Sequence, residues 1–231
     1  MMIKDKMMIA ELPALLAQNP LLPALPLSET YMMDCIAGMK EYPDKWFDLA
    51  VVDPPYGIDY AKRKEKNKKS KIKYTLKDWD SKRPTKEYFN ELFRISQNQI
   101  IWGGNYFLDI LGNSKGMICW DKCQPEGLDQ AMCEYAWTNI NRSAKIIKTS
   151  IQQIQFTRIH PTEKPIKLYD WIYTHYAKEG MNILDTHLGS GSSRIAAHKN
   201  KLNFVGFEID KEYFDKQEKR FANYVCQPRL F

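Results

Sequence analysis

The chain has 231 residues, of which 44% are hydrophobic and 27% are charged, and it carries a formal net charge of +6. A chain of this length can bury a sizeable core, and this composition excludes disordered, collagenous and membrane-embedded proteins. The positive charge is concentrated in residues 62–73, where eight Lys or Arg and one Glu give +7, so the other 219 residues sum to −1. We therefore expect a polyanionic partner to bind near this segment.

The five cysteines are odd in number and scattered, in a chain too large to need disulfide bonds for its stability. This usage is typical of a reducing cytoplasm. Cys119, Cys123 and Cys133 lack C-x-x-C spacing and have no His at ligand spacing, so we expect buried free thiols and no metal.

Residues 1–27 are predicted to form an N-terminal arm. Two lysines precede an apolar run, as in a signal peptide, but Glu11 and Pro13 interrupt this run and no small-residue cleavage site follows. We expect a short helix and a proline-rich part, packed on the domain. No segment reaches the unbroken apolar length that spans a membrane.

In the rest of the chain, apolar strands alternate with amphipathic helices, which predicts an α/β sheet with crossover helices. The predicted strands are residues 47–52, 99–102, 117–120, 135–138, 182–184 and 203–207. The predicted helices are residues 84–96, 164–178, 192–198 and 211–224. The basic segment is too charged to pack and is expected to be a loop.

Residues 53–57 (DPPYG) directly follow the first predicted strand. In an open α/β sheet, ligands bind at the carboxyl ends of the strands. The two prolines remove backbone donors, so the turn presents two acceptors, the Asp53 carboxylate and the Pro54 carbonyl. Beside the Tyr56 ring, these acceptors suit the exocyclic amine of a nucleobase. The alternative is a structural proline turn with a surface Tyr.

Residues 183–193 (ILDTHLGSGSS) read as a strand, a glycine turn and the start of a helix. Glycines let a ligand approach the backbone closely, and Asp185 at the strand end can hold a cationic or hydroxylated group. Glu208 ends the next strand, where a carboxylate can accept from the ribose hydroxyls of an adenosine cofactor. Arg194 replaces the third glycine of the dinucleotide fingerprint, which argues against NAD but not against S-adenosyl-L-methionine (SAM), which has no pyrophosphate.

With these two motifs, the chain resembles the β-class DNA amino-methyltransferases over roughly residues 28–225, a family in which the D-P-P-Y catalytic motif precedes the cofactor motif. Residues 101–107 (IWGGNYF), 119–122 (CWDK) and 160–165 (HPTEKP) also resemble family segments. The resemblance implies one methyltransferase domain over residues 28–231. Its fold is expected to be a Rossmann-like, class I methyltransferase sheet with permuted motif order, mostly parallel with an antiparallel edge strand.

The resemblance also implies the site residues. The target base is expected to be held by Asp53, Pro54, Pro55 and Tyr56. The cofactor SAM is expected to be bound by Asp185, Leu188, Gly189, Ser190, Gly191, Ser192 and Glu208, with Thr162 and Lys164 also in contact. The family usually has an aromatic residue where this chain has His187, for which we expect a positional role.

By hypothesis, the target nucleotide flips out of the duplex and stacks on Tyr56, and its amine attacks the sulfonium methyl in line. Asp rather than Ser at position 53 favours adenine N6 over cytosine N4, by family resemblance. Cytosine N4 and adenine in RNA remain alternatives. Asp53 counts against a glutamine-modifying protein methyltransferase, which has Asn there. An inactive DNA-binding module is the non-enzymatic alternative.

Two segments are expected to contact DNA: the basic loop 61–80 and a short target-recognition region, 138–159. The residues expected to bind nucleic acid are Lys62, Arg63, Lys64, Lys66, Lys68, Lys69, Lys71, Lys73, Arg142 and Lys145. Trp79 and Asp80 are expected to close over the base. So short a recognition region suggests a short or relaxed target, or help from a second subunit, and we expect a homodimer of a bacterial or phage-encoded protein. The alternative for the loop is a solvated surface.

Overall fold

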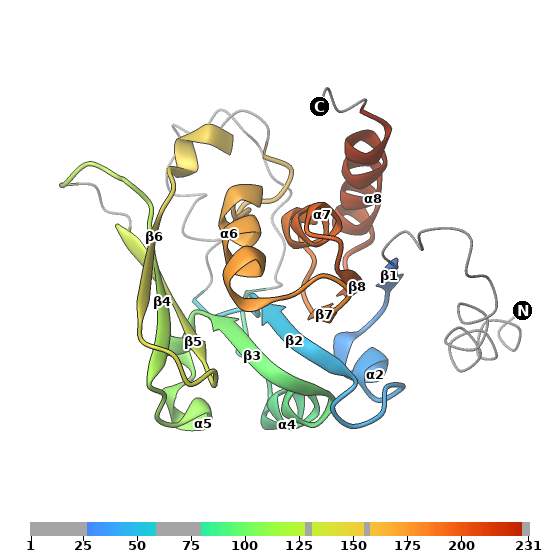
Figure 1. The fold of residues 1–231 in the computed structure, drawn as a ribbon, viewed down its shortest axis with the longest axis horizontal. Helices are drawn as coiled ribbons and strands as arrows, with labels where there is room; N and C mark the ends of the chain where they lie inside the picture. The colour runs from blue at the N-terminus through green and yellow to red at the C-terminus, as the bar shows by residue number, and fades with distance from the viewer. Residues whose placement is uncertain (1–26, 59–79, 128–130, 155–157, 228–231) are drawn as a thin grey trace, which may run out of the picture.

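The computed structural model describes residues 27–58, 80–127, 131–154 and 158–227. Most of the predicted N-terminal arm, and the basic loop except for Asp80, lie outside the described residues. Figure 1 shows one twisted sheet with helices on both faces, which confirms the predicted α/β class.

The described residues form one eight-stranded sheet in the order β1-β8-β7-β2-β3-β5-β4-β6. The strands are β1 (Ser28–Met32), β2 (Phe47–Val52), β3 (Ser96–Trp102), β4 (Gly116–Asp121), β5 (Cys133–Thr138), β6 (Lys145–Lys148), β7 (Asn182–Asp185) and β8 (Asn203–Glu208). β5 runs antiparallel to β3 and β4, and the other neighbouring pairs are parallel. The mostly parallel sheet is confirmed. The antiparallel strand, however, lies inside the sheet and not at its edge, because β4 and β6 pair beyond it.

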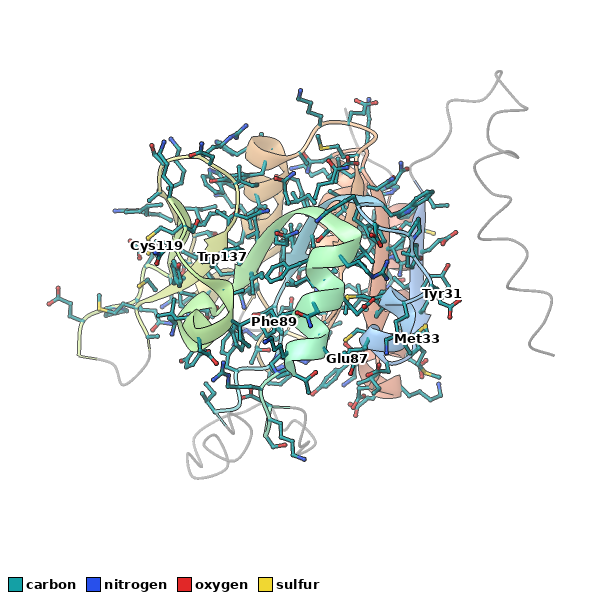
Figure 2. All side chains as sticks on the ribbon, turned by 90° about the horizontal axis from the view of Figure 1, so that it is seen from below. Tyr31, Met33, Glu87, Phe89, Cys119 and Trp137 are labelled. Carbon is teal, nitrogen blue, oxygen red and sulfur yellow. The ribbon has the colours of Figure 1, made fainter. Side chains whose placement is uncertain are left out.

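Helices cover both faces of the sheet (Figure 1). On one face lie α2 (Cys35–Met39) and α4 (Lys86–Ile95), and on the other lie α6 (Ile166–Tyr176) and α7 (Ser192–Lys199), with α8 (Lys211–Cys226) beside α7. Figure 2 looks from below onto the face with α4, where Phe89 and Trp137 are labelled. The short elements are η1 (Gly104–Tyr106), α5 (Leu108–Leu111) and η2 (Ile151–Ile154).

The central strand β2 joins the two halves of the core. Leu49 and Val51 pack with the cluster that contains α6 and α7, and Ala50 and Val52 pack with the cluster that contains α4. Successive side chains of a strand point to opposite faces, so a strand buried on both faces is a nearly continuous apolar run. Because β2 is central in the strand order, the turn after it lies near the middle of the sheet edge formed by the carboxyl ends of the strands.

Side-chain caps determine where two helices begin. The Thr85 hydroxyl accepts from the Tyr88 N–H before α4, and the Asp210 carboxylate accepts from the Glu212 and Tyr213 N–H groups before α8. Such caps satisfy backbone donors that have no partner in the first helical turn. The observed bounds agree with the predicted ones to within a few residues, whereas β1, β6 and α2 were not predicted.

The described cysteines are all free thiols. The expected burial is wrong for Cys123 and Cys133, which are exposed, whereas Cys119 is partly buried. Within the described residues, no group of three or more His, Cys, Asp or Glu side chains is placed to hold a metal ion. None of the helices found there is long and apolar enough to cross a membrane.

Candidate functional site

Polar residues from distant parts of the chain meet at the edge of the sheet that is formed by the carboxyl ends of its parallel strands. Because β2, β3, β4, β7 and β8 point in the same direction, their carboxyl ends lie at the same edge. The amino end of the reversed strand β5 lies there too. The residues at this edge include Asp53, Gly103, Lys122, Glu134, Asp185 and Glu208. In open sheets of this kind, this is the edge at which ligands bind.

The turn after β2 places an aromatic ring beside a carboxylate. The Tyr56 hydroxyl donates to Asp53 Oδ1 at 2.6 Å, and the Tyr56 ring stacks on Tyr106 with ring centroids 4.8 Å apart and planes 13° apart. A Cβ at position 103 would overlap the Tyr56 ring, and Gly103 has a φ of +67°, so only glycine fits there. Pro54 is buried and Pro55 half-buried in the same turn.

Asp80 holds this turn from outside the motif. Its carboxylate accepts from the Tyr56 N–H at 2.8 Å and from the Gly57 N–H at 3.1 Å, and the residue is buried. Asp80 thus holds the backbone of the turn, and its expected closure over the base stays a prediction. Trp79 lies outside the described residues.

Lys164, which was expected to contact the cofactor, lies at the carboxylate of Asp53. Its ammonium donates to Asp53 Oδ2 and lies 3.1 Å from Glu134 Oε2. Glu134 Oε1 in turn lies 2.6 Å from Lys122 Nζ. We call these four groups of alternating charge the buried charge chain. Lys164 is 4% exposed and Lys122 8% exposed.

The pKa values of Asp53, Lys164 and Glu134 are shifted by burial and by the charges beside them. Burial raises the pKa of Asp53, with Lys164 opposing it. Burial lowers the pKa of Lys164, but Asp53 and Glu134 outweigh burial and raise it. Burial would also raise the pKa of Glu134, but Lys164 and Lys122 outweigh it and lower this pKa to about 2. Glu134 therefore keeps its negative charge at all physiological pH values.

The second motif forms a glycine turn between β7 and α7. Gly189 and Gly191 have φ values of +50° and +70°, a region that favours glycine. The Gly189 N–H donates to Glu208 Oε2 at 2.8 Å, and Glu208 Oε1 accepts from the Asp210 N–H at 2.9 Å. The structure thus brings Asp185, the glycines and Glu208 together at the ends of two neighbouring strands.

Asp185 is 2% exposed, and this burial raises its pKa to about 7, with the N–H of His187 at 3.1 Å opposing the rise. Its carboxyl group therefore titrates near neutral pH. Burial lowers the pKa of His187 to about 4, so this imidazole is neutral, with Nδ1 2.9 Å from the Thr186 hydroxyl. The expected positional role of His187 stays a prediction.

Other residues predicted to bind the cofactor make mainly structural contacts. Leu188 packs in the core, where it fills the space that a side chain at Gly206 would need. The hydroxyls of Ser190 and Ser192 lie 3.0 Å apart, and Arg220 donates to Ser192 Oγ at 3.1 Å. Both serines are buried.

Thr162 is connected to the glycine turn by the side chain of His160. Its hydroxyl lies 3.1 Å from His160 Nδ1, and the His160 ring lies against Gly189 and packs edge-on against Tyr213, with centroids 4.3 Å apart. The roles of His160, Glu134, Lys122 and Tyr106 were not predicted from the sequence. The HPTEKP segment indicated that His160 belongs to the site. No local sequence feature, however, shows that His160 packs against the glycine turn whereas Lys164 contacts Asp53.

The predicted nucleic-acid contacts are only partly described. Arg142 donates to the His175 carbonyl at 2.6 Å and lies over the Tyr176 ring, so it fastens its loop to α6. Lys145 is exposed on the edge strand β6. Lys62 to Lys73 lie outside the described residues. The described part of region 138–159 contains β6 and η2.

Curated relatives match parts of the chain. The Type II methyltransferase M2.DpnII of Streptococcus pneumoniae is 39% identical over 61 residues, which are 26% of this chain and 23% of that protein. The orphan methyltransferase M.BamHII of Bacillus amyloliquefaciens is 33% identical over 78 residues, 34% of this chain and 29% of that protein. The matched part thus spans less than a third of either relative.

Solved structures match nearly the whole fold. TTHA0409 of Thermus thermophilus gives a TM-score of 0.58 at 16% identity, over 87% of this chain and 96% of that one. M1.HpyAVI in complex with SAM gives 0.57 at 20% identity, over 83% and 98%. PvuII DNA methyltransferase, described as cytosine-N4-specific, gives 0.58 at 13% identity, over 85% and 87%. These matches confirm the predicted fold.

The sequence model of one family, described as DNA methylase and covering N6 and N4 enzymes, matches residues 60–219. This match covers more than half of the chain and includes the glycine turn and its strand neighbours. It confirms the resemblance that the motifs indicated, and the chain belongs to the DNA methylase family.

Proposed function

We propose that this protein transfers a methyl group from SAM to the exocyclic N6 amine of adenine in DNA. The observation that carries the proposal is the placement of two motifs at one edge of the sheet. The Asp53–Tyr56 turn follows β2, and the Asp185 and glycine turn follows the neighbouring strand β7. A base and a cofactor bound at these two turns would therefore lie next to each other.

The glycine turn fits SAM. When bound, SAM supplies an electrophilic methyl group on a sulfonium sulfur. Asp185 would hold a cationic or hydroxylated part of it, and Glu208 would accept from ribose hydroxyls with lone pairs that its two backbone bonds leave free. Gly189 and Gly191 would allow close approach of the ligand to the backbone, with Leu188, Ser190 and Ser192 supporting the turn and Thr162 acting through His160.

The turn after β2 fits a planar amine. Asp53 and the Pro54 carbonyl would accept its two N–H groups, and the Tyr56 ring would stack on the base. The Asp53 carboxylate would then stabilise the positive charge that develops on the nitrogen. The proton leaves the nitrogen after the methyl group has arrived, so Asp53 need not act as a general base. In the present structure Asp53 Oδ1 accepts from Tyr56 and Oδ2 from Lys164, and these bonds must rearrange when the base binds.

Asp53, at the first position of the D-P-P-Y motif, favours adenine as the target base. Cytosine N4 is the second candidate, because the fold resembles that of PvuII DNA methyltransferase, whose description is cytosine-N4-specific. DNA contacts are assigned to the basic segment 62–73 and to Lys145, which is exposed on the edge strand of the sheet. A homodimer stays a prediction, which sedimentation analysis would test.

The test uses labelled SAM with duplex DNA, single-stranded DNA and RNA, followed by chromatography of the nucleosides. We expect label in N6-methyladenine from duplex DNA, and none with Asp53→Ala. Label only in N4-methylcytosine, or only from RNA, would assign the corresponding alternative. No transfer to any polymer, or undiminished transfer by Asp53→Ala, would contradict the proposal.

A further inference from the structure

We propose that Glu134 and Lys122 are positioning residues for methyl transfer: they hold the Lys164 ammonium, and Lys164 aligns the Asp53 carboxylate toward the amine of the target base. This inference rests on the proposed function of Asp53. It gives a role to three residues of the buried charge chain that the D-P-P-Y motif does not include.

The chain is assembled from four separate parts of the fold. Asp53 follows β2, Lys164 precedes α6, Glu134 lies in β5 and Lys122 follows β4. Asp53 and Lys164 are 111 residues apart in the sequence. The reversed direction of β5 is what brings Glu134 to the same edge as Asp53. A local turn could not provide such a group, so the sheet topology itself positions Lys164.

Two tryptophans line the chain. Lys164 Nζ lies 5.3 Å from the centroid of the Trp102 ring, and Lys122 Nζ lies 5.4 Å from that of Trp120. The two indole rings meet edge-on, with centroids 6.3 Å apart. Aromatic faces partly replace the water that a buried ammonium loses. The two rings therefore restrict where the ammonium groups of Lys122 and Lys164 can lie.

Glu134 provides Lys164 with a second anionic partner besides the Asp53 carboxylate. Asp53 must accept from the amine of the base, yet in this structure it accepts from Lys164. Without a second acceptor, Lys164 would have to stay on Asp53 or lose its only anionic partner, which is costly in a buried site. Glu134 Oε2, 3.1 Å from the ammonium, is that second acceptor. Lys164 can therefore shift its hydrogen bond to Glu134 as the base binds, and its charge still orients Asp53.

Stability alone does not account for this arrangement. Apolar residues of similar volume would stabilise a core at least as well as a buried ionic chain. The exposed pair Lys40–Glu87, whose side chains are 53% and 57% exposed, is of the ordinary surface kind that contributes little. A chain of four charges that ends on Asp53 is instead typical of a site that tunes a catalytic group.

The test compares Glu134→Gln and Lys164→Met in methyl transfer, measured from low to high pH. Both are expected to lower kcat about tenfold or more, with SAM affinity unchanged in calorimetry. Their pH profiles should move in opposite directions. Glu134→Gln removes a charge that raises the pKa of Asp53, so the acidic limb moves to lower pH. Lys164→Met removes the cation that opposes this rise, so the limb moves to higher pH.

Further variants separate positioning from folding. Lys164→Arg should restore part of kcat, because it keeps the charge, and Lys122→Met should lower kcat less than Glu134→Gln. Glu87→Gln is the matched control for an exposed Glu paired with Lys and should leave kcat unchanged. Should Glu134→Gln not fold, Glu134→Asp keeps the charge, and its shorter arm should lower kcat without moving the limb.

Two outcomes would overturn the inference and leave the proposed function uncontradicted. One is a wild-type kcat and pH profile for Glu134→Gln, or for Glu134→Asp where only that variant folds, while Asp53→Ala is inactive. The other is a loss of melting temperature and activity in parallel, with no shift of the limb in either Glu134→Gln or Lys164→Met. If the wild-type protein transfers no methyl group, the proposed function fails as a whole.

Discussion

Tyr106 covers the ring on which the target base is proposed to stack. The rings of Tyr56 and Tyr106 lie 4.8 Å apart and nearly parallel, and Tyr106 is 38% exposed. Tyr106 follows the turn at Gly103, whereas Tyr56 is held by its bond to Asp53. Tyr106 therefore occupies one face of the Tyr56 ring, and we predict that it leaves this face when a base binds.

Tyr106→Ala is expected to lower the KM for DNA about fivefold, because an aromatic pair is worth about 1 kcal/mol. kcat should stay near the wild-type value. Tyr106→Phe keeps the ring and is the matched control, with an unchanged KM. Steady-state kinetics and the fluorescence of 2-aminopurine at the target position measure the effect. A higher KM for Tyr106→Ala would instead make this ring a second wall that holds the base.

Asp185 links stability to pH. Burial raises its pKa from 3.8 to about 7, so between these pH values the folded protein keeps a proton that the unfolded chain has lost. The free energy of unfolding therefore falls as pH rises through this range, and above pH 7 the penalty is complete. Asp185→Asn removes the titration and keeps the shape of the side chain.

We expect Asp185→Asn to be more stable than the wild type at pH 8, by a few kcal/mol, and about equally stable near pH 4. The same variant should bind SAM much more weakly. Urea unfolding at the two pH values and calorimetry with SAM measure these effects. Asp215→Asn, at an exposed carboxylate, is the control and should change neither. Equal stability of Asp185→Asn and wild type at pH 8 would mean that Asp185 ionises normally.

At the scale of elements, the turn from β3 into η1 packs against the Tyr56 ring. Gly103 combines a φ of +67° with direct contact to the Tyr56 ring. Gly180, in the turn before β7, has a φ of +83°, but apart from its chain neighbours nothing in the described structure lies within 4 Å of the position that a Cβ would take there. The two glycines thus share the backbone requirement and differ in the space available.

Gly103→Ala is expected to destabilise the fold by about 3 kcal/mol, because backbone strain and overlap with Tyr56 add. Gly180→Ala should cost only about 1 kcal/mol, from strain alone. Only Gly103→Ala should also lower methyl transfer, since it displaces the ring. Urea unfolding and the methylation assay measure both effects. Equal losses of stability in the two variants would show that Tyr56 yields freely.

The elements that carry the site could be predicted because they are simple. Residues 47–52, 182–185 and 203–208 are short apolar runs, and each ends in an acidic residue or is followed by one. A buried strand places such a residue at the edge of the sheet, so Asp53, Asp185 and Glu208 followed from the pattern alone. The hydrogen-bond partners of these three carboxylates could not be predicted from the same pattern.

Glu134 and Lys122 could not be predicted, because their place depends on the direction of β5. A Glu in a short strand has no local feature that shows which edge of the sheet it reaches. The strand order β3-β5-β4 and the reversal of β5 are properties of the assembled sheet. Lys164 shows the same limit: its motif indicated that it belongs to the site, but its contact with Asp53 depends on how the segment before α6 packs.

At the scale of the whole molecule, charge is divided between two places. The buried charge chain pairs two cations with two anions and adds no net charge. The excess of positive charge belongs to residues 62–73, which follow the Asp53–Gly57 turn closely in the sequence. Phosphate contacts from such a segment give affinity that depends on salt and carries no sequence information. DNA affinity and catalytic geometry should therefore respond to different substitutions.

Replacing Lys66, Lys68, Lys69 and Lys71 by Gln is expected to weaken DNA binding at low salt and to flatten the plot of log affinity against log salt. Each lost phosphate contact should reduce the slope by about 0.9. SAM affinity and the pH profile should not change, because the buried charge chain is intact. Fluorescence anisotropy across a salt series measures the slope. The matched control replaces four exposed lysines, Lys40, Lys199, Lys201 and Lys211, and should leave the slope unchanged. An equal loss of slope in both variants would mean that net charge alone attracts DNA, and a loss of SAM affinity in the first would make the segment structural.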